Sequence, residues 1–155
     1  MRERLGDPLQ LPVEALQLPD GSAQDTAAAA RSYAAALQRR GGVGLQLLGL
    51  GSNGHVGFND PPSDRDRSCH AVTLSPSTRL QNAVMFGGDP AAVPERAITL
   101  GLAEILAAEE IHLVVTGAAK AGILKRLLDL REPDPALPAS WLLTHPNVWL
   151  WCDAA

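Results

Sequence analysis

The chain has few cysteines, and their spacing excludes two kinds of protein. Only Cys69 and Cys152 occur among its 155 residues. Two cysteines so far apart form neither the framework of a disulfide-stapled domain nor the closely spaced ligand set of a structural zinc site. We therefore expect two reduced thiols.

The sequence also lacks a long apolar run and an excess of basic charge. No stretch approaches the roughly 20 apolar residues of a membrane span, and the opening MRERLGDPLQ lacks the apolar core of a signal peptide. The net charge is -4 and the bases are scattered, which leaves no electrostatic footprint for nucleic acid. These absences predict a cytoplasmic protein that binds neither membranes nor nucleic acids.

The sequence does contain enough apolar material for a core. Apolar residues make up 46% and charged residues 19% of the chain, which are ordinary values for a globular protein. A chain of this length can bury roughly 68–70% of its unfolded surface. Because no internal repeat or linker divides it, we expect a single domain over residues 1–155.

The most informative segment is Leu45 to Asp60, which reads LQLLGLGSNGHVGFND. Its apolar first part has little polar alternation, which predicts a parallel strand covered on both faces. The glycines that follow let the backbone turn sharply and approach a ligand. Since open α/β sheets bind ligands at the carboxyl ends of their strands, the turn puts His55 where chemistry is usually found.

These glycines also match the dinucleotide fingerprint G-x-G-x-x-G, but their context argues against it. The fingerprint needs a helix that opens at the glycine turn and an acidic residue about 20 positions later. Here Asn59, Asp60, Pro61 and Pro62 stop any helix, and the next strand candidate ends in Ser75. We therefore expect no dinucleotide cofactor.

Helices and strands alternate along the rest of the chain. Apolar periodicity and turn residues predict helices over 25–40, 75–86 and 118–130, and strands over 45–51, 71–74, 111–115 and 148–152. Such alternation favours a parallel sheet with right-handed crossovers. The expected fold class is α/β, with a doubly wound, mainly parallel, Rossmann-like sheet.

Lys120 lies in the first turn of the helix predicted after the turn at Gly117. A helix N-terminus presents free N–H groups and a positive dipole end, so a lysine there can form a phosphate or carboxylate site. The small residues Gly117, Ala118 and Ala119 leave room for a ligand. A solvated surface lysine is the alternative.

Five motifs in order resemble successive motifs of glucosamine-6-phosphate deaminase: GLGSNGHVGFNDP, VTLSPSTRLQN, VPERAITLG, VVTGAAKA and LLTHPNV. The resemblance covers about Leu9 to Asp153. The sister 6-phosphogluconolactonases share the Gly-His turn but continue differently, and Phe58, Asn59 and Pro61 favour the deaminase branch. The resemblance implies a doubly wound α/β sheet without a metal or organic cofactor.

The same resemblance implies roles for individual residues. His55 matches the histidine that opens the sugar ring by moving a proton between the ring oxygen and the C1 hydroxyl, and Asp60 matches the acid that orients it. A histidine exchanges protons near neutrality, and a carboxylate fixes its tautomer. Asn53 stands where some members carry aspartate, and Lys120 matches the lysine that grips the substrate phosphate. Further substrate contacts are predicted at the three glycines Gly51, Gly54 and Gly117.

The chain also departs from the family pattern. Val84 stands where the family often has an arginine on the phosphate. Family members have a longer N-terminal part that supplies the first strands, a phosphate loop and the aspartate base for proton transfer between C1 and C2, so we expect this chain to be the C-terminal portion of such a fold. Loss of those strands would uncover an edge or face of the sheet and invite pairing with another chain, which is consistent with a homo-oligomer.

The leading hypothesis is an enzyme that isomerises and deaminates an amino-sugar phosphate. It would convert glucosamine 6-phosphate to fructose 6-phosphate and ammonia through a cis-enol intermediate. The first alternative is a non-catalytic remnant that binds a sugar phosphate through His55 and Lys120 but lacks the base. The second alternative is a hydrolase of the 6-phosphogluconolactonase type.

Overall fold

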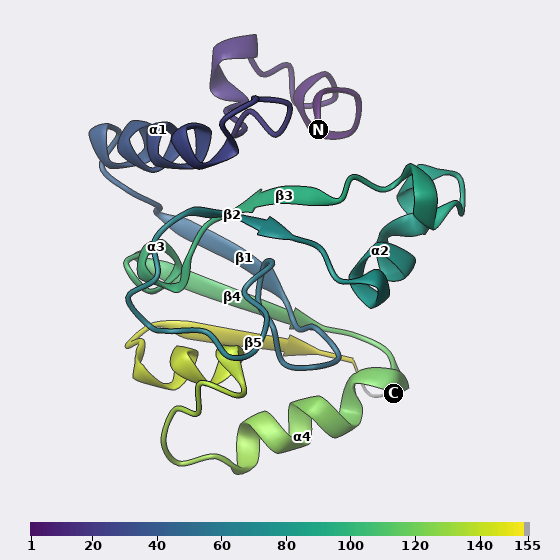
Figure 1. The fold of residues 1–155 in the computed structure, drawn as a ribbon. Helices are drawn as coiled ribbons and strands as arrows, with labels where there is room; N and C mark the ends of the chain where they lie inside the picture. Colours follow the sequence, from purple (N-terminus) through teal and green to yellow (C-terminus); the bar gives the residue numbers. More distant parts are fainter. Residues whose placement is uncertain (154–155) are drawn as a thin grey trace.

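A computed structural model describes residues 1–153, in which strands and helices alternate (Figure 1). The strands are β1 (Leu45–Gly49), β2 (His70–Thr73), β3 (Arg96–Thr99), β4 (Glu110–Val115) and β5 (Val148–Cys152). The α-helices are α1 (Thr26–Arg39), α2 (Pro76–Asn82), α3 (Leu102–Leu106) and α4 (Ala121–Asp129). The other helical turns are η1 (Arg2–Gly6), η2 (Val13–Ala15), η3 (Ala83–Phe86), η4 (Pro90–Ala92), η5 (Ala118–Lys120) and η6 (Pro138–Thr144).

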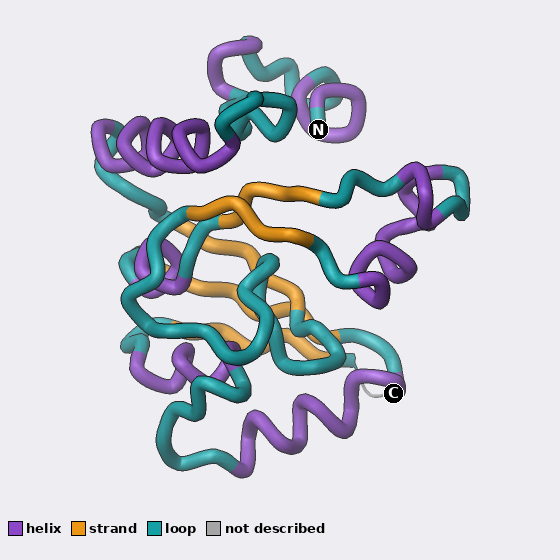
Figure 2. Tube along the Cα trace, viewed as in Figure 1, coloured by secondary structure: helices purple, strands orange, loops and turns teal. Residues whose placement is uncertain are grey.

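The strands form two separate sheets (Figure 2). The larger sheet is parallel, with the order β1-β4-β5, and pairs Leu47 with His112 and His112 with Trp149. The parallel α/β fold predicted from the sequence is confirmed. The strand predicted at 71–74 is present as β2, but it pairs antiparallel with β3 and lies outside the parallel sheet. The connection between β2 and β3 contains α2, η3 and η4 and brings the chain back alongside β2 in the opposite direction, so the two strands pair antiparallel.

One face of the parallel sheet is covered and carries the core. Leu48, Ile111 and Leu113 point to this face and are buried. Helices α3 and α4 and the turn η6 supply the apolar side chains that pack against them. The remaining members of this cluster are Leu50, Val56, Leu102, Ile105, Ala108, Val115, Leu127, Leu137, Ala139 and Leu142.

The other face of the same sheet is not covered. Its side chains, called the open face below, are those of Leu45, Leu47, Glu110, His112, Val114, Trp149 and Trp151. Leu47 is 64% exposed and Trp149 is 53% exposed. The prediction that the strand at Leu45 is covered on both faces is therefore wrong. An apolar pattern shows that a strand can be buried, but the covering layer has to come from other segments, and none of the described residues supplies it.

Helix ends follow the sequence signals closely. The Asp25 carboxylate accepts a hydrogen bond from the N–H of Ala28 at 2.9 Å and caps α1. Gly41 and Gly42, with φ of 94° and 91°, end that helix. The helix predicted at 118–130 begins as the turn η5 and continues as α4.

Within residues 1–153, no helix is both long and apolar enough to cross a membrane.

Candidate active site

The turn after β1 folds back on itself and brings a side chain over its own backbone. The N–H of Gly51 donates to the carbonyl of His55 at 2.9 Å, and the N–H of Gly54 donates to the carbonyl of Gly51 at 3.0 Å. A Cβ atom on Gly51 would lie 2.3 Å from two atoms of the His55 ring. Only glycine therefore lets the imidazole lie over this turn.

The three predicted catalytic side chains lie in mutual contact. The Nδ1 atom of His55 is 2.7 Å from Oδ1 of Asn53 and 3.3 Å from Oδ1 of Asp60. The Asn53 side-chain amide in turn donates to Oδ1 of Asp60 at 3.0 Å. Because both neighbours of Nδ1 are oxygen acceptors, we assign the proton of the neutral ring to Nδ1. Nε2 then carries the lone pair, and it has no hydrogen-bond partner within residues 1–153.

The surroundings of His55 favour its neutral form. Burial is the largest influence and lowers the pKa of His55 from its ordinary value of 6.5. The charge of Asp60 and its hydrogen bond raise this pKa, while the charge of Lys120 lowers it, and the net direction is downward. A neutral imidazole with a free Nε2 can accept a proton at neutral pH and return it afterwards. The arrangement is therefore suited to proton exchange with a bound hydroxyl group.

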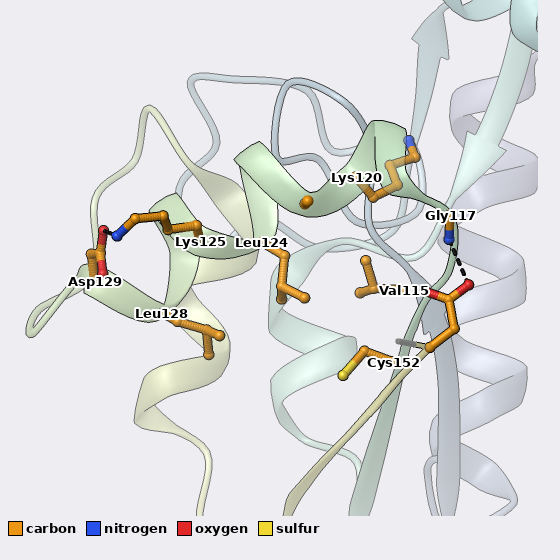
Figure 3. Close-up of a pocket in the computed structure, with 10 residues that line it drawn as sticks. Val115, Gly117, Lys120, Leu124, Lys125, Leu128, Asp129 and Cys152 are labelled. Carbon is orange, nitrogen blue, oxygen red and sulfur yellow. Dashed lines mark hydrogen bonds and ion pairs between the residues drawn. The ribbon is translucent and has the colours of Figure 1, made fainter. Parts of the chain in front are cut away.

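Lys120 follows the carboxyl end of the neighbouring strand β4. Its backbone N–H donates to the carbonyl of Gly117 at 2.9 Å, and it is the N-cap residue of α4. His55 and Lys120 follow the carboxyl ends of β1 and β4, which are neighbouring parallel strands, so both lie at the same edge of the sheet. Lys125, one turn further on, points the other way and binds Asp129 at 2.7 Å (Figure 3). Among the described residues no carboxylate lies within ion-pair distance of the Lys120 ammonium, so its charge is available to a ligand.

A hollow of about 310 Å³ lies beside the start of α4 (Figure 3). Gly117, Lys120, Leu124 and Asp153 are among the residues that line it, and His55 is not. His55 therefore lies outside this hollow. We regard His55 as the chemical centre because its proton-exchanging group has a fixed tautomer and orientation, whereas the hollow contributes space and a positive charge.

The three glycines predicted to contact substrate use their N–H groups internally. The N–H groups of Gly51 and Gly54 bind within the turn, and that of Gly117 donates to the Asp153 carboxylate at 2.8 Å. Direct substrate contact by these glycines stays a prediction. The sequence reasoning missed Asp153, although its position directly after the last predicted strand is the same signal that pointed to the His55 turn.

Within residues 1–153, no group of three or more His, Cys, Asp or Glu residues could hold a metal ion.

Comparison with known proteins decides the family. Residues 1–151 match the family described as glucosamine-6-phosphate isomerases/6-phosphogluconolactonase. The chain belongs to this family. The resemblance inferred from the sequence motifs is thereby confirmed.

The relatives within the family are longer than this chain. A glucosamine-6-phosphate deaminase from Rhodopirellula baltica is 42% identical over 156 residues, which cover 100% of this chain and 61% of the relative. One from Beutenbergia cavernae is 43% identical over 141 residues, which cover 91% of this chain and 54% of the relative. The chain thus spans 54% to 61% of the length of these curated relatives.

Solved structures of both kinds of enzyme named in the family description match this chain. A structure described as a monomeric glucosamine-6-phosphate deaminase matches with a TM-score of 0.93 and 34% identity, over 99% of this chain and 63% of that one. A 6-phosphogluconolactonase from Trypanosoma cruzi matches with a TM-score of 0.68 and 19% identity, over 97% of this chain and 61% of that one. The second likeness shows the fold alone, and the first agrees with the deaminase-like motifs.

Proposed function

We propose that this chain supplies the ring-opening and phosphate-binding part of a glucosamine-6-phosphate deaminase. Such an enzyme converts glucosamine 6-phosphate and water into fructose 6-phosphate and ammonia. One observation carries the proposal: Asn53 and Asp60 hold Nδ1 of His55 and leave Nε2 without a partner among the described residues, at the same edge of the sheet as Lys120.

Ring opening requires one group that both accepts and donates a proton. Nε2 of His55 takes the proton of the C1 hydroxyl as the bond between C1 and the ring oxygen breaks, and the ring oxygen receives that proton from the same nitrogen. The imidazolium formed in between is stabilised by the Asp60 carboxylate 3.3 Å from Nδ1. Asn53, being neutral, orients the ring without adding charge.

Phosphate binding is assigned to Lys120. Its ammonium has no carboxylate partner within residues 1–153, and it lines the hollow beside α4. A compact ammonium is suited to a phosphate as a point charge. Val84 stands where the family often has an arginine on the phosphate, so Lys120 would supply the larger share of the attraction.

Isomerisation after ring opening needs a second base to move a proton from C2 to C1. Asp60 is already engaged by Asn53 and His55. The resemblance assigns this base to an aspartate in the portion of the relatives that lies outside the match. Residues 1–155 taken alone are therefore proposed to bind the substrate and open its ring, and complete conversion is proposed for His55 acting together with that aspartate.

Binding without turnover is the second candidate function. It is favoured by the share of the curated relatives that the match leaves out, which is about two fifths in the Rhodopirellula baltica deaminase. No specific contact favours lactone hydrolysis. The cytoplasmic location and the homo-oligomeric state predicted from the sequence stay predictions, which cell fractionation and light scattering would test.

Ring opening can be measured without the later steps. The protein should accelerate exchange between the α and β anomers of glucosamine 6-phosphate, as followed by NMR exchange spectroscopy. His55→Gln should slow that catalysed exchange by roughly 100-fold or more, because general acid–base catalysis contributes about 10²–10⁴. Ammonia release, measured in parallel, reports complete turnover.

Phosphate binding is tested by thermal shift with the same ligand. Lys120→Met should abolish the shift, while Lys125→Met, which removes a charge that also borders the hollow but is paired with Asp129, should reduce it far less. Stabilisation without anomer exchange would establish the second candidate function. An unshifted protein without exchange activity, or equal effects of the two lysine substitutions, would overturn the proposal.

A further inference from the structure

The turn that leads from β4 to Lys120 is not held in place by packing. Residues 116–119 are all exposed. A Cβ atom on Gly117 would meet nothing within 4 Å, and the φ of 87° at this residue is one that glycine adopts far more readily than other residues. The conformation of the turn therefore depends on its hydrogen bonds.

Two hydrogen bonds at Gly117 connect Asp153 with Lys120. The N–H of Gly117 donates to Oδ2 of Asp153 at 2.8 Å, which is the dashed line at Gly117 in Figure 3. The carbonyl of Gly117 accepts the N–H of Lys120 at 2.9 Å. A lysine side chain is a flexible stem, so the position of its backbone decides which region the ammonium can reach. The Asp153 carboxylate is thus one residue away from the group that fixes this position.

Asp153 acts where the backbone pairing of the sheet ends. The last paired residues of β4 and β5 are Val115 and Cys152. Beyond this pair the side chain of Asp153 takes over the connection, and a carboxylate accepts an N–H more strongly than a neutral oxygen does. Among the described residues no Lys or Arg pairs with Asp153. Its carboxylate therefore does not neutralise Lys120 in an ion pair.

We propose that Asp153 is a positioning residue for phosphate binding, because its hold on Gly117 sets where Lys120 presents its ammonium. This role rests on the proposed function, in which Lys120 binds the substrate phosphate. The hydrogen bond of Asp153 places the lysine, whereas its negative charge beside the same hollow repels a phosphate. Substitution by Ala removes both the hydrogen bond and the charge, and substitution by Asn removes only the charge.

The test is calorimetric titration of the full chain and its variants with glucosamine 6-phosphate. Asp153→Ala should weaken binding by about 10-fold, because a hydrogen bond to a charged group stabilises the placed conformation by a factor of that order. Asp153→Asn should bind at least as tightly as the parent chain. Asp25→Ala is the matched control, since it removes a carboxylate that accepts a backbone N–H at 2.9 Å in α1, and it should leave the dissociation constant unchanged.

Two further measurements separate positioning from a general loss of structure. Hydrogen exchange of the Gly117 amide, followed by NMR, should be slow in the parent chain and in Asp153→Asn, and faster in Asp153→Ala. Anomer exchange at saturating ligand should be the same in all these proteins, because Asp153 makes no contact with His55.

The alternatives give different results. Equal tightening by both Asp153 substitutions would mean that the carboxylate only repels the phosphate or occupies a donor that the phosphate needs, and it would overturn the proposed role. An unchanged dissociation constant in Asp153→Ala, or a Gly117 exchange rate that is the same in every variant, would also overturn it. A parent chain that binds no glucosamine 6-phosphate would instead overturn the proposed function, and with it the part of Asp153 in phosphate binding.

Discussion

The two faces of the parallel sheet are built from the same strands and the same kinds of residue, but they meet different surroundings. Ile111 and Leu113 are buried on the covered face, whereas Leu47 and Trp149 on the open face are more than half exposed. The candidate site is supported from the covered side. The carbonyl of Gly54 accepts the N–H of Ala139 in η6 at 2.9 Å. The turn that carries His55 is therefore fixed even though one face of the sheet is bare.

The largest expected effect contrasts two neighbouring leucines that point to opposite faces. Leu48→Ala removes a side chain that is 6% exposed in the core, and it should reduce the free energy of unfolding by about 2–5 kcal/mol. Leu47→Ala changes the adjacent residue on the open face, and it should cost less than about 0.5 kcal/mol. Urea denaturation of the two variants beside the parent chain measures both values.

Equal losses would break the contrast between the faces. They would mean that Leu47 is buried in solution against another molecule, and the midpoint of unfolding would then rise with protein concentration. A midpoint that is independent of concentration, together with unequal losses, would leave the open face exposed to water.

Features of the fold that depend only on residues close together in the sequence could be predicted. The cap at Asp25 and the glycines at 41 and 42 set the ends of α1 without help from distant residues. The exposure of Leu45 and Leu47 was not predictable, because it depends on whether another segment covers them. The antiparallel pairing of His70 with Thr99 likewise depends on how the intervening chain returns, which apolar periodicity does not report.

An effect of intermediate size on stability is expected from a substitution where the His55 turn packs against the covered side. Gly54 has φ of 88°, and a Cβ there would lie 2.4 Å from Cδ1 of buried Leu137. Gly54→Ala should therefore cost roughly 1–3 kcal/mol of stability, because both the backbone and the packing are strained. Gly122→Ala meets nothing within 4 Å in α4 and should stabilise the chain by up to about 1 kcal/mol.

The two glycine variants should also differ at His55. Gly54→Ala should shift its imidazole resonances in NMR spectra, and Gly122→Ala should leave them in place. A Gly54 variant with unchanged stability and unchanged His55 resonances would mean that η6 does not support the turn.

In the candidate site, too, contacts within one short segment could be predicted from the sequence, whereas a contact between distant segments could not. Asn53, His55 and Asp60 belong to one short turn, so their spacing sufficed to predict that they meet. The tie between Gly117 and Asp153 joins the ends of β4 and β5, and it depends on the register that pairs Val115 with Cys152. The position of Asp153 after a predicted strand marks it as a candidate, but a sequence pattern does not report the register, so its contact with Gly117 could not be predicted.

The smallest expected effect concerns the charge state of His55. The pKa of His55 lies below 6.5 because burial and Lys120 lower it more than Asp60 raises it. Asp60→Asn removes the raising influence, so the pKa of His55 should fall further, and Lys120→Met should move it upward. NMR titration of the His55 Cε1 proton measures both shifts.

The lowered pKa of His55 also predicts how the stability of the folded chain changes with pH. Since the pKa of folded His55 lies below that of the unfolded chain, protonation opposes folding, and stability is lost as the pH falls from about 6.5 toward the folded value. Asp60→Asn should enlarge this acid-side loss and Lys120→Met should reduce it. If Asp60→Asn instead raised the pKa of His55, the carboxylate would not face Nδ1 in solution. The stabilisation of the imidazolium proposed for Asp60 would then have to be abandoned, while the contrast between the two faces would remain.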